Sequence, residues 1–284
     1  MILRFAGVFA AVLLTAGTAL AAAGCPGKPG ALGVARVLAV DPAGHGRIGS
    51  IQYREMLPLG DREVVLTFDD GPQAPNTARV LDALAAECVK ATFFVIGNSA
   101  RRAPKLLRRA YDEGHTIGTH SETHPLHMPR MPVEAATKEI AGGFASAGAA
   151  LGPSRAVAPF FRFPALNRTQ ALENYTASQR LMVWSADIYA DDWMAISPAE
   201  VAARPIERLE KAGRGVVLFH DIQGRTAAAL PVFLKELKRR GFRIVHVVAA
   251  DANRPKVVTA AAEWRALDKA VLMVPPHMRA QRRD

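Results

Sequence analysis

The chain has 284 residues, half of them hydrophobic, which is enough to bury a sizeable core and argues against a disordered protein. Its formal net charge of +10 favours contact with an anionic polymer, such as nucleic acid, an anionic membrane face or an acidic cell-wall glycan. No alternation of aromatic and basic residues and no helix-turn-helix pattern accompanies this charge, so we do not expect nucleic acid to be the partner.

The N-terminal residues contain the parts of a secretory signal. Arg4 precedes an apolar stretch over residues 5–20, and the small residues Ala21–Ala23 follow it. We therefore expect residues 1–23 to be a signal peptide and the protein to be periplasmic or secreted, with no stable membrane insertion once the signal is removed. One alternative is an uncleaved anchor, although the stretch is short for a full span. Another is a lipid anchor at Cys25, although a lipobox would have a large apolar residue three places earlier.

Cys25 and Cys88 are the two cysteines of the chain. An even pair in an oxidising compartment predicts a disulfide that ties the segment after the signal to the first helix. The alternative is that Cys88 packs as a small buried hydrophobe, because Val80, Leu84 and Cys88 recur at the four-residue spacing of one helix face.

Residues 24–62 are rich in glycine and proline, and we expect them to form an irregular leader that lies across the domain. From Val64 onward, apolar runs alternate with helical patterns, which predicts a parallel α/β sheet with right-handed crossovers. Enough such units can close into a barrel. The predicted strands are Val64–Phe68, Thr92–Ile96, Thr116–His120, Phe160–Pro164, Leu181–Ala186, Val216–His220 and Arg243–Val248.

The connections between these strands carry helical patterns. Ser197-Pro198-Ala199-Glu200 has the residues of a capping box with proline in the first turn. Residues 251–284 are polar and basic, and we expect a surface tail with one short helix near Ala260–Leu267. The remaining predicted helices are the one that carries Val80 and Leu84, then Lys105–Tyr111, Pro132–Ala150, Thr169–Ser178 and Ala227–Arg240.

Polar residues crowd at the ends of the predicted strands. In a parallel barrel the carboxyl ends of all strands meet at one mouth, and active sites lie there. Residues that are far apart in sequence are therefore expected to gather around this mouth. They are Asp69, Asp70, His120, Arg162, Asp187, His220 and Asp221.

Asp69 and Asp70 form an adjacent pair between an apolar run and a Gly-Pro turn. Neighbouring carboxylates disfavour joint ionisation, and a cation beside them removes much of that cost. Successive side chains on an extended segment point different ways, so one carboxylate can bind a metal while the other faces water or substrate. His120 and His124 have a spacing that places both imidazoles on one face of a helical turn. With Asp70 they form a ligand set that suits zinc, and also cobalt, nickel or ferrous iron.

Hydrolysis at such a metal needs a base for the attacking water and an acid for the leaving group. Asp69, beside a metal ligand, is the predicted base, and Arg162 is placed to orient it and keep it ionised. His220 ends another strand and is the predicted acid, with Asp187 as the residue that holds its ring and charge. Each of these residues taken singly is usually structural, but a chance gathering of all of them at strand ends would be unusual.

Taken together, these motifs resemble the polysaccharide deacetylase family, the NodB-type domain of carbohydrate esterase family 4. The resemblance covers residues 63–250 and implies a single domain, a distorted (β/α) barrel of about seven parallel strands, with the same base, acid and metal ligands. It adds Trp193 and Leu218 as the lining of an acetyl-methyl pocket. The five motifs are Thr67-Phe68-Asp69-Asp70, His120-Ser121-Glu122-Thr123-His124, Arg162-Phe163-Pro164, Asp187 with Asp191-Asp192-Trp193, and Leu218-Phe219-His220-Asp221.

The chain departs from the family pattern at one place. After Arg-x-Pro the family usually has Tyr-Gly, and this chain has Ala165-Leu166. The resemblance implies that the backbone N–H at Ala165 helps to bind the oxyanion. The missing tyrosine side chain changes the shape expected for the sugar subsite.

The predicted function is that of a metal-dependent hydrolase that removes acetyl groups from an N-acetylated polysaccharide of the cell wall or envelope. One alternative is a carbohydrate-binding protein on an inactive deacetylase scaffold, against which the intact base, acid and ligands argue. An O-acetyl esterase acting on a glycan is a second alternative. A non-haem iron oxygenase shares the ligand type but does not normally need an acid histidine.

Overall fold

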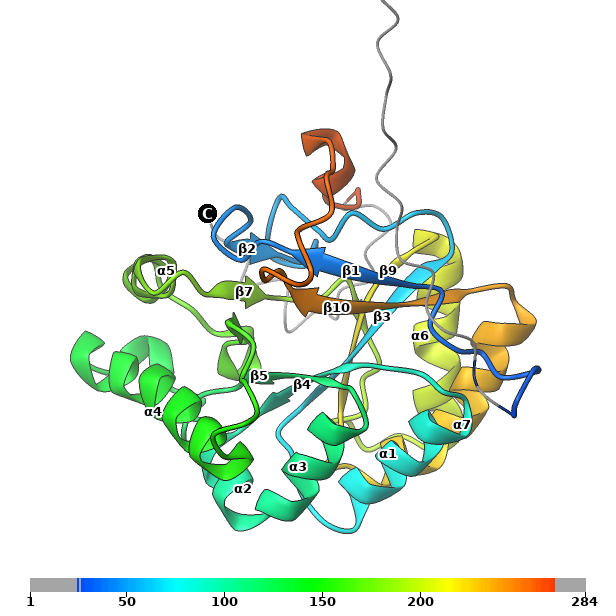
Figure 1. Cartoon of the computed structure of the whole chain (residues 1–284), viewed down its shortest axis with the longest axis horizontal. Helices are drawn as coiled ribbons and strands as arrows, with labels where there is room; N and C mark the ends of the chain where they lie inside the picture. Colours follow the sequence, from blue (N-terminus) through cyan, green and yellow to red (C-terminus); the bar gives the residue numbers. More distant parts are fainter. Residues whose placement is uncertain (1–24, 26, 269–284) are drawn as a thin grey trace, which may run out of the picture.

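The computed structural model describes residue 25 and residues 27–268, so the expected signal peptide lies outside the described residues. Strands and helices alternate along most of this range (Figure 1). Among the described helices, none combines the length and the apolar character needed to cross a membrane.

The strands are β1 (Arg36–Val40), β2 (Arg47–Ile48), β3 (Glu63–Asp69), β4 (Thr92–Val95), β5 (Thr116–Thr119), β6 (Phe160–Phe161), β7 (Met182–Trp184), β8 (Ile188–Tyr189), β9 (Gly215–His220) and β10 (Arg243–Ala249). The helices are α1 (Asn76–Ala86), α2 (Gly97–Arg102), α3 (Pro104–Asp112), α4 (Val133–Leu151), α5 (Gln170–Ser178), α6 (Pro198–Ala212) and α7 (Gly224–Arg239), with short 3-10 turns η1 (Met128–Arg130), η2 (Pro164–Leu166) and η3 (Ala261–Trp264).

The described strands form one ten-stranded sheet in which neighbouring strands run parallel. β3 lies at its centre, with β9 along one edge from Val64 to Asp69. Its other edge is shared between β10, beside Glu63 and Val64, and β4, beside Thr67–Asp69. The sheet continues from β4 through β5, β6, β7 and β2, and from β9 to β8, which gives a curled, distorted barrel (Figure 1).

The seven predicted strands are all present, with ends displaced by a few residues. Three further strands, β1, β2 and β8, were not predicted. Two of them lie in the segment expected to be an irregular leader, where β1 pairs with β10 and β2 pairs with β7. That expectation is wrong for these residues. β2 has only two residues and so no readable periodicity, and β1 is an apolar run within a glycine- and proline-rich segment that takes its conformation from its pairing with β10.

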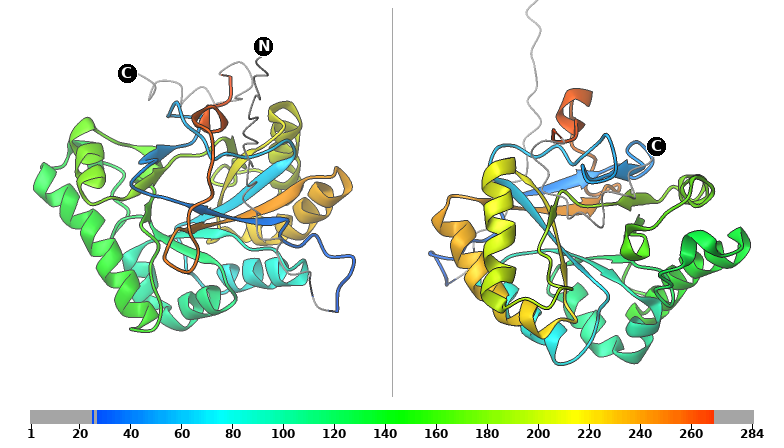
Figure 2. Two further views of the ribbon diagram at one scale, coloured as in Figure 1. Left: turned by 45° about the horizontal axis from the view of Figure 1, so that its top comes forward. Right: turned by 180° about the vertical axis from the view of Figure 1, so that it is seen from behind.

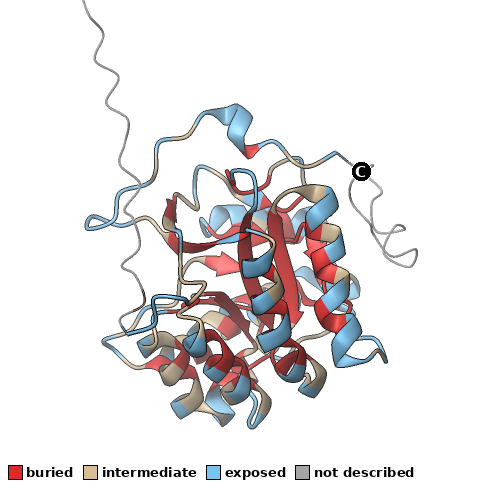
Figure 3. Cartoon of the chain, turned by 90° about the vertical axis from the view of Figure 1, so that its right-hand side faces the viewer, coloured by how far each residue is buried: buried red, intermediate tan, exposed pale blue. Residues whose placement is uncertain are grey.

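The burial of β3 explains where its two terminal carboxylates point. Val64 and Phe68 pack in a cluster with side chains of α1, α6 and α7, whereas Val65 packs on the opposite face, among side chains from other strands. Since side chains alternate along a strand, Asp69 lies on the Val65 face, inside the barrel. Figure 3 shows the buried strands and the helices that expose only their outer sides.

Residues 251–268 follow β10 and contact the segment after β2, where Arg265 forms a β-bridge with Glu55; η3 lies above the sheet in Figure 2. The expected short helix is present as η3. Its Trp264 is buried, joins the cluster inside the barrel, and stacks on His45 with ring centroids 3.4 Å apart. The backbone N–H of Leu267 donates to the Ser50 hydroxyl at 2.9 Å. For residues 251–268 the expectation of a surface tail is therefore too simple, because a single buried tryptophan anchors an otherwise polar segment. The rest of the expected tail, residues 269–284, lies outside the described residues.

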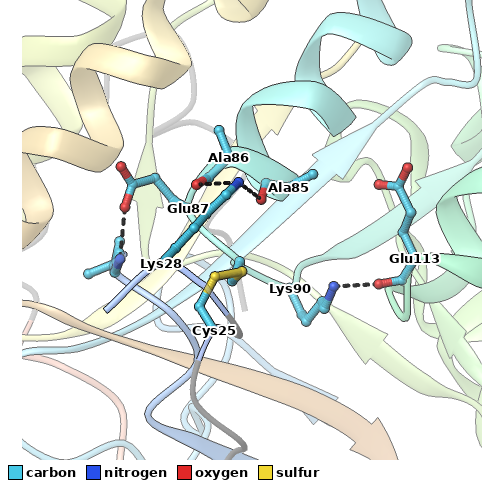
Figure 4. The surroundings of a disulfide bond; sticks show 9 residues. Cys25, Lys28, Ala85, Ala86, Glu87, Lys90 and Glu113 are labelled. Atoms are coloured by element: carbon cyan, nitrogen blue, oxygen red, sulfur yellow. Dashed lines mark hydrogen bonds between the residues drawn. A yellow bond between two sulfur atoms is a disulfide. The ribbon is translucent and has the colours of Figure 1, made fainter. Parts of the chain in front are cut away.

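A disulfide joins Cys25 and Cys88, with their Cα atoms 5.8 Å apart (Figure 4). Helix α1 ends at Ala86, so Cys88 follows the helix at a positive φ and does not continue the face of Val80 and Leu84. The ammonium group of Lys28, beside the disulfide, donates to carbonyls in the last turn of α1. A lipid anchor at Cys25 would need the same sulfur atom, so the disulfide argues against that alternative.

Candidate functional site

Asp69 and His220 lie side by side at the mouth of the barrel. They end the adjacent strands β3 and β9 and are direct partners in the register of this parallel pair. Asp70, the next residue, has a φ of 80°, so the chain leaves the extended conformation there. The two neighbouring carboxylates therefore take different directions at the end of one strand.

Asp70 lies against the two histidines of the H-x3-H motif. Its Oδ1 is 3.4 Å from Nε2 of His124 and 3.7 Å from Nε2 of His120. The same Oδ1 is buried and has no hydrogen-bond partner in the described structure. A buried carboxylate oxygen without a partner is costly unless a cation satisfies it.

His120 is oriented as a ligand. Its Nδ1–H donates to the carbonyl of Arg162 at 2.7 Å, which leaves the lone pair of Nε2 directed at Asp70 and His124. Burial, together with the neighbouring His124 imidazole, holds the pKa of His120 well below its ordinary value. A neutral imidazole is the form that binds a metal.

The two histidines do not lie on a helical turn, and that expectation is wrong. The segment after β5 is a loop in which Ser121 and His124 have φ values of 65° and 61°. The Ser121 hydroxyl accepts a hydrogen bond from the His124 N–H at 3.0 Å and so holds the loop closed. A loop with two left-handed residues brings together the same pair of imidazoles that a helical turn would.

The residues present fit a divalent cation. One ligand atom from each of Asp70, His120 and His124 lies within 4.8 Å of the others. Two neutral imidazoles and one carboxylate leave open positions for water and substrate.

Asp69 is held by a buried arginine. Nη1 of Arg162 donates to Oδ1 of Asp69 at 2.6 Å. The guanidinium is completely buried, and its other N–H groups donate to Thr67, Trp184 and Ser185. Burial raises the pKa of Asp69, while the positive charges of Arg162 and His220 oppose that rise. The free Oδ2 lies 3.8 Å from Nε2 of His120 and faces the site.

His220 is paired with Asp192, and the expected pairing with Asp187 is wrong. Nδ1–H of His220 donates to Oδ1 of Asp192 at 2.7 Å, and the His220 backbone N–H donates to Oδ2 at 2.7 Å. Asp187 instead accepts backbone hydrogen bonds from Ser50 and Val216.

The register of β8 explains this exchange of roles. Ile188 lies beside Val217, so Asp187 is level with Val216, four residues before His220 and roughly 13 Å away along the strand. The turn after β8 then brings Asp192 to the mouth. Asp192 was a candidate partner for His220 in the sequence, since it precedes Trp193 in the fourth motif. The choice between Asp192 and Asp187 depends on the register of β8 against β9, which the sequence does not reveal.

The carboxylate of Asp192 determines the charge of His220. Burial alone would lower the pKa of this imidazole. The charge and hydrogen bond of Asp192, with the charges of Asp70 and Asp69, outweigh burial and raise the pKa to about 10. His220 is therefore protonated at neutral pH and can give up a proton from Nε2.

These groups line a pocket of about 400 Å³. Trp193 forms one wall, with its ring edge-on to His220 at 5.8 Å and to Tyr189 at 5.4 Å. Of the predicted residues, Arg162 lies behind Asp69, and Asp187 is remote from the pocket. The lining consists of Asp69, Asp70, His120, His124, Leu126, Phe163, Ala165, Leu166, Tyr189, Trp193, Leu218, His220 and Gln223.

Ala165 and Leu166 adopt left-handed conformations, with φ values of 50° and 58°. Ala165 is exposed at the pocket, whereas Leu166 is buried in a cluster with Leu218 and Tyr189. A glycine would adopt this backbone conformation without strain. Ala165 and Leu166 therefore adopt a left-handed backbone conformation that residues with a Cβ disfavour.

Asp221 is a structural residue of the mouth. Its carboxylate is completely buried and accepts hydrogen bonds from the Gly71 N–H and the Thr77 hydroxyl. A Cβ at Gly71 would overlap this carboxylate, at 2.0 Å from Oδ2. Asp221 thus holds the loop after β3 against β9 and fixes the direction in which Asp70 leaves the strand.

Comparison with known proteins gives consistent matches. The family model described as polysaccharide deacetylase matches residues 57–184. Chitooligosaccharide deacetylase of Rhizobium leguminosarum bv. trifolii is 32% identical over 204 residues, which are 65% of this chain and 89% of that protein. Peptidoglycan-N-acetylglucosamine deacetylase PgdA of Listeria monocytogenes is 32% identical over 190 residues, 66% of this chain and 38% of that protein.

Among solved structures, the peptidoglycan deacetylase Bd3279 of Bdellovibrio bacteriovorus superposes with a TM-score of 0.68 at 34% identity. The match covers 79% of this chain and 62% of that one. The described chain thus spans only part of the length of the Listeria and Bdellovibrio relatives, and most of the length of the Rhizobium protein.

Proposed function

Because the chain belongs to the polysaccharide deacetylase family, we propose that it is a metal-dependent hydrolase that removes acetyl groups from an N-acetylated polysaccharide of the cell wall or envelope. The observation that carries this proposal is the unpartnered, buried Oδ1 of Asp70 beside two histidine Nε2 atoms, with Asp69 and His220 nearby at the ends of β3 and β9. The names of the relatives, which refer to peptidoglycan and chitooligosaccharides, support the substrate class.

A divalent cation held by Asp70, His120 and His124 would supply Lewis-acid activation of water and of the acetyl carbonyl. Zinc suits this ligand set, and cobalt, nickel and ferrous iron are alternatives. Oδ2 of Asp69 takes the proton of the attacking water, while Arg162 fixes Oδ1 and favours the ionised carboxylate. The water oxygen forms a bond to the acetyl carbon as this proton leaves.

The later steps use Ala165 and His220, which also line the pocket. The backbone N–H of Ala165 is the proposed donor to the oxyanion that forms on the acetyl oxygen. Nε2–H of His220 then gives its proton to the departing amine as the C–N bond breaks, and Asp192 stabilises the imidazolium and holds the ring. Trp193 and Leu218, with Tyr189, form the apolar wall for the acetyl methyl group. In this assignment Asp187 supports the backbone and takes no part in the chemistry.

The proposed location is outside the cytoplasm, in the periplasm or secreted. The apolar stretch near the N-terminus and the Cys25–Cys88 disulfide support this location. The expected signal peptide remains a prediction.

Release of acetate tests the proposed activity. The purified chain, reconstituted with zinc and assayed on a panel of N-acetylated and O-acetylated glycans, is expected to release acetate with formation of free amines. Chelation is expected to abolish the activity, and added zinc to restore it. A folded, metallated protein that releases no acetate from any N-acetylated glycan would support the binding alternative, and release from O-acetyl groups alone would support the esterase.

A further inference from the structure

A second hollow, of about 550 Å³, meets the active-site pocket at Asp70 and His124. We call it the Arg102 groove. One wall is the loop after β3, and the other is the end of α2, where Ser99 and Arg102 lie. Its lining residues are Asp70, Pro72, Gln73, Ala74, Ile96, Ser99, Arg102, Ala103, His124 and Ile222.

The guanidinium of Arg102 is available to a ligand. The side chain is exposed, and no hydrogen bond or ion pair to it is found within the described part of the chain. The preceding residue gives the contrast, because Arg101 is held by Glu122, Asn98 and Ser146. Of these two adjacent arginines at the end of α2, Arg101 is held by hydrogen bonds to other side chains, whereas Arg102 has no such partner among the described residues.

The two hollows also differ in the positively charged residues that line them. Among the described residues, Arg102 is the only lysine or arginine that lines the groove, and none lines the active-site pocket. The one acidic residue of the groove is Asp70, whose carboxylate belongs to the candidate metal site. The remaining lining is apolar apart from Gln73, Ser99 and His124, so Arg102 is the feature that can select a charged group.

We propose that Arg102 is a specificity-determining residue that binds a carboxylate carried by the glycan close to the reacting N-acetyl group. The inference rests on the proposed function, since the groove is placed by the metal ligands Asp70 and His124. A guanidinium matches a carboxylate with two parallel N–H···O hydrogen bonds, and such charge-assisted contacts are strong and selective.

A carboxylate partner for Arg102 narrows the class of substrate. In a peptidoglycan-type glycan, every second sugar carries a lactyl ether that ends in a carboxylate or a peptide. Chitin-type glycans carry no charged substituent. The Arg102 groove therefore favours the acidic, peptidoglycan-type chain over the neutral one.

The experiment compares an oligosaccharide with free lactyl carboxylates and the same oligosaccharide with these groups methyl-esterified. Zinc-reconstituted full chain is expected to have a higher kcat/KM for the acid, and this preference is expected to weaken with salt. Arg102→Gln should reduce the ratio of kcat/KM for acid over ester about tenfold or more, mainly through KM, because a charge-assisted contact is lost. Arg102→Lys should restore part of the ratio through its charge.

Lys105→Gln is the matched control. Lys105 is exposed, lies just beyond α2, lines neither hollow and carries the same charge, so its loss should leave the ratio unchanged. An equal kcat/KM for acid and ester, or an Arg102→Gln ratio equal to that of the unchanged chain, would overturn the inference while leaving the deacetylase proposal intact. Absence of acetate release from both substrates and from chitooligosaccharides would instead overturn the proposed function, and the inference with it.

Discussion

Asp69 and Asp70 are adjacent residues with different surroundings, and this difference separates their proposed roles. Asp69 remains in the strand, completely buried and bonded to Arg162, whereas Asp70 leaves the strand at a positive φ and faces two imidazoles. Neither residue could take the place of the other without a change in the backbone. Substitution of Asp69 should therefore affect turnover, and substitution of Asp70 should affect metal binding.

Asp69→Asn is expected to keep the metal and to lower kcat about a hundredfold or more, because the amide cannot accept the proton of the water. Its size is conserved, and its Oδ1 can still accept from Arg162. Asp70→Ala and His120→Ala are expected to lose the metal itself. Metal analysis and kinetics on the same samples separate the two outcomes. A fully metallated Asp69→Asn protein with normal turnover would refute the base assignment.

Asp192→Asn is expected to shift the alkaline limb of the kcat/KM profile to lower pH. Asp192 helps to raise the pKa of His220 from 6.5 to about 10, so removal of its charge lowers that pKa, and the acid loses its proton at a lower pH.

The pairing of His220 with Asp192 also stabilises the fold. A histidine whose folded pKa is raised contributes stability that is fully present below pH 6.5 and is lost as the pH rises through about 10.

Asp191→Asn is the neighbouring control for this prediction. Asp191 is as buried as Asp192, but it pairs with Arg204 and Arg208 and does not contact His220. Its substitution should lower the free energy of unfolding and leave the alkaline limb in place. A limb that moves equally in both variants would show that the effect is structural and not a property of the His220 pair.

Ala165→Gly is expected to stabilise the protein by up to about 1 kcal/mol. A left-handed conformation costs a residue with a Cβ roughly 1–2 kcal/mol, and the greater freedom of glycine in the unfolded chain offsets about half of that gain. The backbone N–H is retained, so kcat should change by only a small factor. Ala228→Gly on the exposed face of α7 should have the opposite sign, at about 1 kcal/mol of destabilisation. Urea unfolding of both variants tests the argument.

For single helices and strands, the sequence predicts the features that are local and periodic. The apolar run of β3 and its alternation place Asp69 inside the barrel, and the capping box predicted at Ser197 and Glu200 is present at the start of α6. What it could not predict depends on contacts that are distant in sequence. The short strands β1 and β2 exist through their pairing with β10 and β7, and the partner of His220 is determined by the register of β8 against β9.

The candidate site shows the same division. Its residues could be predicted from the sequence, because carboxylates and imidazoles at strand ends are typical of metal and catalytic sites. The conformation of the His120–His124 segment could not, since two residues adopt a left-handed backbone that only the surrounding fold can stabilise. The Arg102 groove could not be predicted from the sequence either, because it depends on which of two adjacent arginines has a partner in the folded chain.

The C-terminal segment is held to the domain by one buried side chain. Trp264 is buried against His45 and the interior of the barrel, so Trp264→Ala should destabilise the protein by about 3 kcal/mol. Val258, in the same segment, is 93% exposed, and Val258→Ala should change the stability by less than about 0.5 kcal/mol. Equal unfolding midpoints for the two variants would mean that the segment does not dock in solution.

The whole chain combines a positive net charge with a candidate site that is rich in carboxylates. The net charge of +10 attracts an anionic polymer over a distance, and this attraction should decrease with salt. The carboxylates at the barrel mouth are neutralised locally, by Arg162 for Asp69 and by His220 for Asp192. Attraction of an anionic glycan and the proposed chemistry would therefore depend on different charges. Among the described residues that line the two hollows, Arg102 is the only lysine or arginine.

The Cys25–Cys88 disulfide is a property of the whole molecule, because it ties the beginning of the described chain to the end of α1 across 63 positions. Closing a loop of this length in the unfolded state is worth about 4 kcal/mol by loop entropy. Reduction, or Cys88→Ser, is therefore expected to lower the urea midpoint substantially. Cys25→Ser should have the same effect, and the double variant should be no worse than either single one, since all three remove one bond.

Exported material gives the final test of the same bond. Intact mass is expected to show a chain that begins between Ala22 and Cys25, and thiol counting should find no free thiol before reduction and both after it. The mass separates the two alternatives: a chain that retains residues 1–20 would indicate an anchor, and an added lipid mass with Cys88 free would indicate a lipoprotein. If both thiols are free in folded, exported protein, the disulfide and the stability assigned to it are refuted together.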